Sequence, residues 1–213
     1  MLKPAKKRVT PYAWVTWLAK VMAGEKQCEY AVWKLAQYQF DKLPSDYDSS
    51  EHDQMVIKRA SQLRAEGFTV YVENANSLKV NGRDYNICIA GRPDIVAIKD
   101  GCVVVEDCKS GKHRDSHRFQ VLLYMLLLRY APETKKRCQG MEPHGRLIYR
   151  EDIVDIPAEA VDNQFIQLLR QTIETIVNTT PPSPKASTWE CRYCNIPGTY
   201  CSARIDSGLQ TVA

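Results

Sequence analysis

The spacing of apolar residues along the chain alternates between a helical and a strand-like period. Apolar positions three or four residues apart predict a helix over residues 12–40, with a break near Gly24. After a polar turn at residues 44–50, a second helix is predicted from a cap at Ser49 through about residue 66. Runs rich in valine, isoleucine and tyrosine then predict strands. These strands cover residues 68–73, 78–80, 85–89, 93–98 and 103–108, with a hairpin turn at Asn81-Gly82.

Helical periodicity returns after the strands. The pattern predicts a helix at residues 116–130, an edge strand at 146–150 and a long amphipathic helix at 158–177. Residues 179–187 contain three prolines and are predicted to form a linker, because proline removes a backbone donor and interrupts a helix. The sequence therefore predicts an α/β fold in which a mixed central sheet is flanked by helices.

Two short polar motifs lie on neighbouring predicted strands. Gly-Arg-Pro-Asp at residues 91–94 opens one strand, and Asp-Cys-Lys at residues 107–109 ends the next. The Asp100-Gly101 pair between them is typical of a two-residue hairpin. Such a hairpin folds Asp94 back toward Asp107, so the two carboxylates are expected to lie close together.

Alternation along the strand decides which acid faces the site. Successive side chains of a strand point to opposite faces, so Asp107 and Lys109 face the same way, while Glu106 and Cys108 face the other way. Asp107, and not Glu106, is therefore the candidate ligand.

The residue types indicate metal-assisted hydrolysis of a phosphodiester. Carboxylates such as Asp94 and Asp107 are hard oxygen ligands suited to Mg²⁺ or Mn²⁺, and such an ion lowers the pKa of its bound water. Lys109 can orient the attacking water and offset the growing negative charge. Gln120 and Tyr124 lie four residues apart on one side of the next helix, where they can face the metal or a strand of DNA.

A competing interpretation as a phosphate-binding loop fails. Ser-Gly-Lys-His at residues 110–113 has part of that pattern, but Glu106 stands where the first glycine belongs. His113 stands where the loop needs Ser or Thr.

The ordered combination of motifs over residues 91–124 resembles a known superfamily. Gly-x-x-Asp, a strand ending in Asp-x-Lys, and Gln-x-x-x-Tyr on the following helix are similar to the PD-(D/E)XK nucleases, in their RecB-like branch. The resemblance implies a restriction-endonuclease-like fold with a mixed central sheet. Glu73, at the end of a predicted strand, occupies a place where such nucleases often carry an acid, and it is an auxiliary candidate.

Four of the eight cysteines have the spacing of ligands. Cys191, Cys194 and Cys201 supply three thiolates within eleven positions, and Cys28 is the candidate for the fourth. Four thiolates can take zinc or an iron–sulfur cluster. One distant cysteine combined with this triplet resembles the iron–sulfur nucleases, where the cluster joins the C-terminus to the N-terminal helices. The remaining cysteines are expected to be free thiols; they are Cys88, Cys102, Cys108 and Cys138.

With both features in 213 residues, the chain resembles the stand-alone CRISPR-associated RecB-like exonuclease family. The resemblance implies one nuclease domain over residues 1–213, with a core at about 48–178 and an iron–sulfur lobe built from 12–40 plus 179–205. In that family the metal is held by a histidine of an upstream helix, by the two motif acids and by the main-chain carbonyl between acid and lysine. The matching positions are His52, Asp94, Asp107 and the carbonyl of Cys108.

The resemblance also implies a function. It indicates a metal-dependent DNA exonuclease with a 4Fe-4S cluster and Mn²⁺ or Mg²⁺, which acts on single-stranded DNA or DNA ends and processes DNA for CRISPR spacer acquisition with the integrase complex. Two alternatives remain open. One is a non-catalytic DNA-end-binding scaffold with the nuclease fold, although intact Asp94, Asp107 and Lys109 argue against it. The other is a repair nuclease outside CRISPR systems, with zinc in place of the cluster.

Composition adds little to this picture. A net charge of +4 is compatible with a nucleic-acid partner but does not indicate one by itself. The longest apolar run, residues 121–128, is far shorter than the roughly 20 residues of a membrane span. The basic N-terminus lacks the apolar region of a secretion signal, so a cytoplasmic protein without disulfides is expected. The run Lys3–Arg8 is expected to be a disordered tail.

Overall fold

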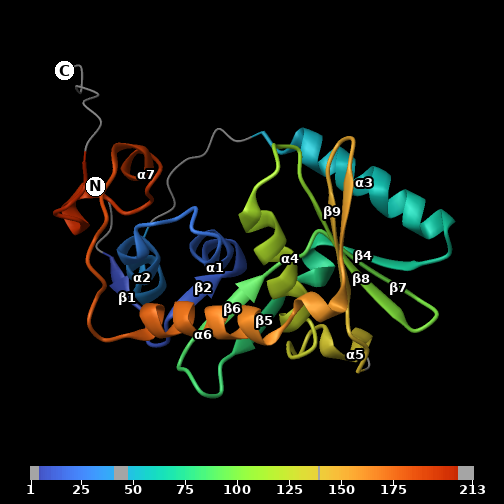
Figure 1. Ribbon diagram of the computed structural model, residues 1–213, viewed down its shortest axis with the longest axis horizontal. Helices are drawn as coiled ribbons and strands as arrows, with labels where there is room; N and C mark the ends of the chain where they lie inside the picture. Colours follow the sequence, from blue (N-terminus) through green and yellow to red (C-terminus); the bar gives the residue numbers. More distant parts are fainter. Residues whose placement is uncertain (1–4, 41–47, 139, 206–213) are drawn as a thin grey trace.

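The computed structural model describes residues 5–40, 48–138 and 140–205 (Figure 1). Most of the predicted polar turn at residues 44–50 lies outside these residues, as do the first two positions of the basic tail. The rest of that tail is not disordered, contrary to the prediction. Lys6–Lys7 form strand β1, which pairs with β3 (Tyr38–Gln39). The segment is held on both sides of β1, because Ala5 N donates to the Tyr200 hydroxyl at 3.0 Å and Arg8 N donates to Gln37 O at 2.8 Å.

A five-stranded mixed sheet forms the centre of the fold, in the order β10-β9-β8-β7-β4. Strands β8 and β9 are parallel, and the other neighbours are antiparallel. The predicted α/β class with a mixed central sheet is therefore confirmed. The strands are β4 (Thr69–Val72), β7 (Ile95–Lys99), β8 (Cys102–Cys108), β9 (His144–Ile148) and β10 (Ile153–Ile156).

One edge of this sheet differs from the prediction. The strand predicted at the edge over residues 146–150 corresponds to β9, which lies inside the sheet, and the edge is β10. Sequence analysis missed β10 because a strand of four residues is too short for its alternation to stand out. It forms because Tyr149 N donates to Asp152 O at 2.8 Å and closes a hairpin with β9.

A three-stranded sheet, β2-β6-β5, lies beside the first. Its strands are β2 (Tyr12–Trp14), β5 (Leu78–Asn81) and β6 (Cys88–Gly91). The helix predicted from residue 12 is therefore wrong at its start, because β2 pairs parallel with β6. The two-residue turn predicted at Asn81-Gly82 is also wrong. Gly82 N donates to Ile87 O at 2.8 Å, so a longer loop connects the strands and β6 begins at residue 88 rather than 85.

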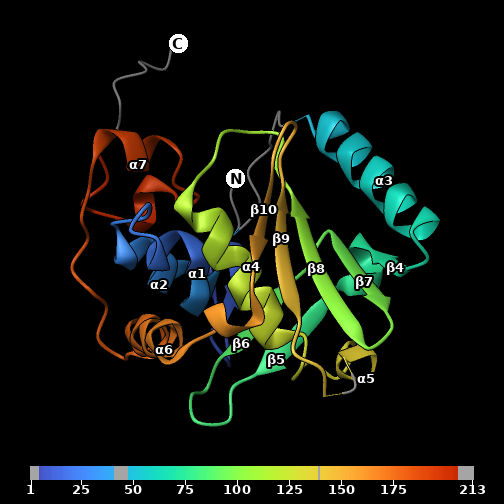
Figure 2. The same cartoon turned by 45° about the vertical axis from the view of Figure 1, so that its right-hand side comes forward.

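Helices cover both faces of the five-stranded sheet (Figures 1 and 2). Helix α4 packs on the face that carries Val103 and Val105, and α3 packs on the face that carries Ile95 and Ala97. The predicted break near Gly24 is confirmed, since one helix ends at Met22 and the next begins at Glu29. The α-helices are α1 (Val15–Met22), α2 (Glu29–Gln37), α3 (Ser50–Ala65), α4 (Asp115–Leu127), α5 (Lys135–Cys138), α6 (Asn163–Val177) and α7 (Thr188–Arg192).

Three short 3₁₀ turns complete the described elements: η1 (Glu73–Asn76), η2 (Ala158–Ala160) and η3 (Gly198–Tyr200). The helix predicted from residue 158 therefore begins at Asn163, after η2. Asp162 caps it, because its side chain accepts a hydrogen bond from Phe165 N at 2.8 Å.

The β7–β8 hairpin turns where the sequence predicts it. Asp100 has φ 48° and Gly101 has φ 79°, as a type I′ turn requires, and Lys99 faces Cys102 across the turn. The side chains then alternate as predicted. Val105 belongs to the core under α4, and Cys108 belongs to the core under α3.

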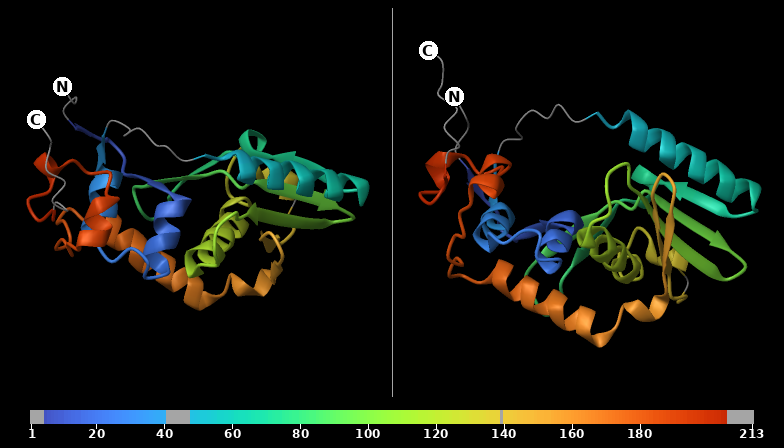
Figure 3. Two further views of the ribbon diagram at one scale, coloured as in Figure 1. Left: turned by 90° about the horizontal axis from the view of Figure 1, so that it is seen from above. Right: turned by 45° about the horizontal axis from the view of Figure 1, so that its top comes forward.

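The two ends of the described chain meet at one side of the molecule (Figure 3). A small separate core contains Cys28, Ala31 and Ile196, and Gln27 N donates to Glu190 Oε1 at 2.8 Å. Residues that are far apart in the sequence therefore form one lobe around α2 and α7. Among the described residues, no helix has the length and hydropathy needed to cross a membrane.

Candidate active site

Asp94 and Asp107 lie at the open end of the β7–β8 hairpin, opposite the Asp100-Gly101 turn. The register pairs Ile95, the first residue of β7, with Glu106, so Asp94 and Asp107 lie directly beyond this last pair of the ladder. Asp94 Oδ2 accepts a hydrogen bond of 2.7 Å from the backbone N of Cys108. The hairpin thus brings the two sequence motifs together.

Asp107 is a buried carboxylate, with 1% of its surface exposed. Gln120 Nε2 donates to its Oδ1 at 3.0 Å, and Lys109 Nζ lies 2.5 Å from its Oδ2. Burial raises the pKa of Asp107 to about 6, the negative charge of Asp94 adds to this effect, and Lys109 opposes it. Two acids therefore share a poorly solvated space with one ammonium group.

Helix α4 packs beside the acids and contributes Gln120 and Tyr124 to the site. Lys109 Nζ donates to Gln120 Oε1 at 3.1 Å, Gln120 Nε2 lies 3.4 Å from the Tyr124 hydroxyl, and that hydroxyl donates to Arg92 O at 3.3 Å. Burial works to lower the pKa of Lys109, but the charge of Asp107 more than offsets it and the pKa is raised. Burial raises the pKa of the Tyr124 hydroxyl. Lys109 is therefore a cation, and Tyr124 is a neutral donor, at neutral pH.

The glycine of the first motif has a packing role. A Cβ on Gly91 would lie 2.6 Å from Cε1 of Tyr124 and 2.9 Å from Cγ2 of Val15. Only glycine permits β6 to approach α4 and α1 this closely. Gly91 therefore lets Tyr124 reach the backbone next to Asp94.

Helix α3 brings His52 to the acids from the other side. His52 Nε2 lies 3.4 Å from Asp94 Oδ1, and this hydrogen bond raises the pKa of His52. The helix is held by Arg59, whose guanidinium donates two hydrogen bonds of 2.7 Å to the fully buried Glu106. Glu106 therefore points away from Asp107, toward α3.

Comparison with known proteins identifies the family of this arrangement. The family model of the PD-(D/E)XK nuclease superfamily matches residues 11–199. The chain belongs to the PD-(D/E)XK nuclease superfamily. The solved crystal structure of SSO0001 is similar to this nuclease domain, with 19% sequence identity, a TM-score of 0.49, and coverage of 93% of this chain and 89% of that chain. No curated protein matches the chain.

The nuclease domain contains a buried polar residue that sequence analysis missed. Asn76 is fully buried, and its Nδ2 donates to Tyr71 O at 2.9 Å and to Pro93 O at 3.3 Å. Arg137 Nη1 lies 3.2 Å from its Oδ1. Asn76 therefore fixes the backbone immediately before Asp94. Nothing in the polar stretch around residue 76 distinguishes it from an ordinary turn residue, so the sequence gives no signal for this role.

The donors of the site fit a hard divalent cation. Asp107 Oδ2 is buried and has no hydrogen bond of regular geometry in the described structure, although it contacts Lys109. A buried carboxylate oxygen beside a second acid is the kind of ligand that Mg²⁺ and Mn²⁺ prefer. Asp94, Asp107 and the carbonyl of Cys108 are the groups that would hold the ion, with His52 next to Asp94.

A second group of donors adjoins the first. His52, Asp53 and Glu73 each offer a donor atom, and these three atoms lie within 4.8 Å of one another. In the described part of the chain, no other three His, Cys, Asp or Glu residues bring their donor atoms this close together. Glu73 has φ 41° in the left-handed region, and its backbone N donates to Asp94 O at 2.8 Å. The auxiliary candidate Glu73 therefore lies next to the acid pair, and Asp53 is a neighbour that sequence analysis missed.

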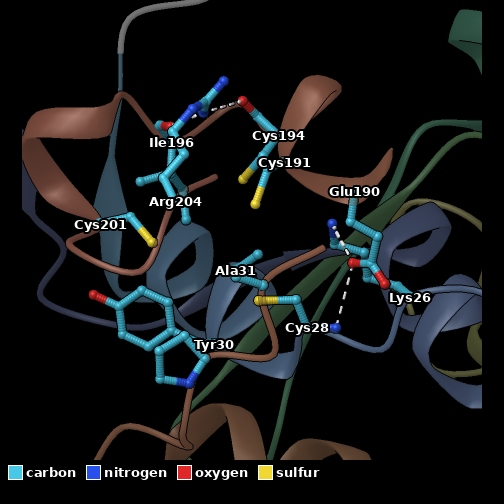
Figure 4. A pocket seen from close by; sticks show the side chains of 12 residues that line it. Lys26, Cys28, Tyr30, Ala31, Glu190, Cys191, Cys194, Ile196, Cys201 and Arg204 are labelled. Atoms are coloured by element: carbon cyan, nitrogen blue, oxygen red, sulfur yellow. Dashed lines mark hydrogen bonds and ion pairs between the residues drawn. The ribbon is translucent and has the colours of Figure 1, made fainter. Parts of the chain in front are cut away.

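The four candidate cysteine ligands line one pocket (Figure 4). Cys28 comes from the start of α2, Cys191 from α7, and Cys194 and Cys201 from the segment after it. No three of their sulfur atoms lie within 4.8 Å of one another in the described structure. The pocket nevertheless gathers the four thiols of the predicted ligand set.

The other cysteines take no part in this pocket. All eight cysteines are free thiols in the structure, and Cys88, Cys102, Cys108 and Cys138 lie outside the pocket lining. Cys108 turns its side chain into the core under α3, so only its main chain faces the acids. Burial raises the pKa of its thiol.

A histidine pair flanks the site beyond Lys109. His117 Nδ1 lies 2.9 Å from the Tyr149 hydroxyl, and the ring of His113 stacks on Tyr149 with centroids 3.6 Å apart. Partial burial lowers the pKa of His117 to about 4, and the positive charge of Lys109 adds to the effect. His117 is therefore neutral in the folded protein above about pH 5.

This shift predicts a pH dependence of stability. The folded pKa of His117 lies below the ordinary value of 6.5, so its contribution is full above pH 6.5 and is lost as the pH falls toward 4. His117→Gln should therefore lose less thermal stability than the wild type between pH 7 and 4, by roughly 2–4 °C in Tm. Thermal unfolding across this pH range measures the effect. His144→Gln, at an exposed histidine of β9, is the control, and equal losses in wild type and His117→Gln would contradict the assignment.

Proposed function

We propose that this nuclease domain is a metal-dependent DNA exonuclease that acts on single-stranded DNA or DNA ends. One observation carries the proposal: Asp107 is buried beside Asp94, with Lys109 Nζ 2.5 Å from its carboxylate. A buried acid with a raised pKa, beside a second acid and one ammonium group, is typical of a functional site. Membership in the nuclease superfamily supports the same chemistry.

Each residue has a role that follows from its contacts. Asp94 and Asp107, with the Cys108 carbonyl and His52, would hold Mn²⁺ or Mg²⁺, which supplies an activated water and stabilises charge on the phosphate. Lys109 holds its charge against Asp107 and is placed to orient a water for attack on phosphorus. Gln120 fixes both Asp107 and Lys109, because its amide donates to one and accepts from the other. Tyr124 fixes Gln120 and the Arg92 carbonyl.

The four cysteines support an iron–sulfur cluster as a structural cofactor. Cys28, Cys191, Cys194 and Cys201 line one pocket, and four thiolates are the ligands that such a cluster takes. The pocket joins the first helices to the last described segment, so a 4Fe-4S cluster would tie these two parts of the chain together. The proposal keeps a nuclease core at about residues 48–178 and a cluster lobe built from about 12–40 plus 179–205, with α1 of the lobe packed on α4 of the core.

The biological role is proposed from the resemblance of the motifs. A RecB-like exonuclease of this size, with one distant cysteine before a C-terminal triplet, resembles the CRISPR-associated family that trims DNA for spacer acquisition. The partner would be the CRISPR integrase complex. A scaffold that only binds DNA ends remains the alternative in which the acid pair has no catalytic use.

Nuclease activity tests the acid pair directly. Asp107→Asn and Lys109→Met should each degrade end-labelled single-stranded DNA at least about 100-fold more slowly than wild type in Mn²⁺, since each removes a preorganised charge from the reacting phosphate. Asp155→Asn, at an exposed acid on β10, should keep wild-type activity. Equal rates for wild type and Asp107→Asn would remove the site assignment. Binding without any cleavage, unchanged by a chelator, would favour the scaffold.

Visible absorption tests the cofactor. Protein purified without oxygen should be brown and contain iron, because iron–sulfur clusters absorb in the visible range and zinc does not. Cys194→Ser should lose the colour and the iron, whereas Cys102→Ser, at an exposed cysteine outside the pocket, should retain both. A colourless wild type that contains stoichiometric zinc would show the cofactor proposal to be wrong.

A further inference from the structure

The loop between α1 and α2 contacts the first turn of α4, the helix that carries Gln120. Glu25 of this loop accepts two hydrogen bonds from Ser116, one from the backbone N at 2.9 Å and one from Oγ at 2.7 Å. The two residues are 91 positions apart in the sequence. Ser116 is 5% exposed, whereas Glu25 is exposed. A distant part of the chain therefore binds a buried polar residue at the start of α4.

Glu25 takes the place of a local cap. Arg114, at the N-cap position of α4, forms no capping hydrogen bond with its side chain. A helix leaves its first backbone N–H groups without partners, and a carboxylate at this end also interacts favourably with the helix dipole. Burial works to raise the pKa of Glu25, but the hydrogen bonds from Ser116 and the charge of Arg114 outweigh it, and the pKa is lowered. Glu25 is therefore an anion at neutral pH that caps α4 from another part of the chain.

The turn after α1 directs Glu25 toward α4. Gly24 has φ 69°, in the left-handed region that favours glycine, and its backbone N donates to Val21 O at 2.9 Å. Lys26 N then donates to Lys20 O at 2.9 Å and closes the loop back on the helix. Helix α1 itself packs on α4. Glu25 therefore extends from a closed turn at the end of a helix that already lies against α4.

The next residues of the same loop are fixed to α7. Lys26 Nζ lies 2.7 Å from Glu190 Oε2 (Figure 4). The backbone N groups of Gln27 and Cys28 donate to the same carboxylate at 2.8 Å and 3.3 Å. Glu190 belongs to α7 and lines the pocket of the four candidate cysteine ligands, as does Cys28. Residues 25–28 therefore join that pocket to α4 through four consecutive positions.

One turn of α4 separates Ser116 from the acid pair. Gln120 lies four positions after Ser116 and hence on the same side of the helix. Its amide donates to Asp107 Oδ1 at 3.0 Å and accepts from Lys109 Nζ at 3.1 Å. A shift of the first turn of α4 therefore moves the neutral group that contacts both members of this buried pair.

We propose that Glu25 is a positioning residue for the acid pair. By capping α4 at Ser116, it sets the place from which Gln120 holds Asp107, and it carries the position of α7 to the site. This rests on the proposed function and adds the residue through which the lobe around α2 and α7 acts on the metal site. Removing a partner that orients a metal ligand changes metal affinity by roughly 10–100-fold. Glu25 acts one contact further away, so its effect is smaller.

Binding of Mn²⁺ tests the proposal separately from cleavage. The free ion is measured by its electron paramagnetic resonance signal, with the full chain as isolated and without DNA. Glu25→Ala should raise the Kd for Mn²⁺ about three- to tenfold, because Gln120 loses its fixed position. Glu25→Gln should stay within about twofold of wild type, since its amide can accept from Ser116 N and donate to Ser116 Oγ. An unchanged Kd in Glu25→Ala would overturn the proposal.

Asp162→Ala is the matched control, because Asp162 is also an exposed acid that caps a helix. It caps α6 and not α4, through a hydrogen bond of 2.8 Å from Phe165 N. Each alanine variant should lower Tm by roughly 2–4 °C, since each loses a cap. Only Glu25→Ala should change the Kd for Mn²⁺. An equal rise in Kd for both would show that the loss of any cap loosens the site, and the proposal would fail.

Ser116→Ala covers the case in which Glu25→Ala fails to fold, because it removes only the hydroxyl from the contact. It should raise the Kd for Mn²⁺ about two- to fivefold. A wild-type Kd in this variant would count against the proposal by itself.

Glu190→Ala tests the part played by α7. It frees the backbone of residues 27–28, so it should raise the Kd for Mn²⁺ in the wild type but add nothing in Glu25→Ala, as expected of residues that act through one contact. Additive losses would show that α7 acts on the site by another route, and that part of the proposal would be wrong.

Asp107→Asn separates this proposal from the proposed function. If this variant binds Mn²⁺ as tightly as the wild type, the acid pair is not the metal site and the proposed function fails as well. If Asp107→Asn weakens Mn²⁺ binding and Glu25→Ala does not, the proposed function stands and only the role of Glu25 is refuted.

Discussion

The register of one hairpin determines the candidate site. Because Ile95 faces Glu106, Asp94 and Asp107 follow as the next pair, and the Asp94 carboxylate is bonded to Cys108 N at 2.7 Å. A slip of one residue would turn Asp107 to the opposite face and bring Glu106 into its place. The type I′ turn at Asp100-Gly101 fixes this register, so a local turn preference controls chemistry several residues away.

Charges on the two faces of β8 place the surrounding helices. On one face, Asp107 is held by Lys109 and by Gln120 of α4. On the other, Glu106 is buried against Arg59 of α3, the helix that carries His52. Removing one partner of a buried charge pair is strongly destabilising, so the Arg59–Glu106 pair specifies where α3 packs, whereas α4 is joined to Asp107 by the neutral amide of Gln120. Adjacent residues of a single strand thus position both walls of the site.

The sequence predicted the parts of the site that depend on local pattern. The Asp-Gly turn, the alternation along β8 and the helical spacing of Gln120 and Tyr124 are properties of short segments. The missed features depend on distant contacts. β2 forms because β6 lies beside it, and the burial of Asn76 results from Tyr71 and Pro93, which its own neighbours in the sequence do not reveal. Asp53 approaches Glu73 only because α3 packs against the sheet.

The central claim is that Asp94 and Asp107 share one cation, and anomalous diffraction from a crystal grown with Mn²⁺ tests it most directly. The account predicts a manganese peak within about 2–2.5 Å of a carboxylate oxygen from each of these two acids. A peak held only by His52, Asp53 and Glu73, with Asp107 still bound to Lys109 and Gln120 and to no metal, would contradict it.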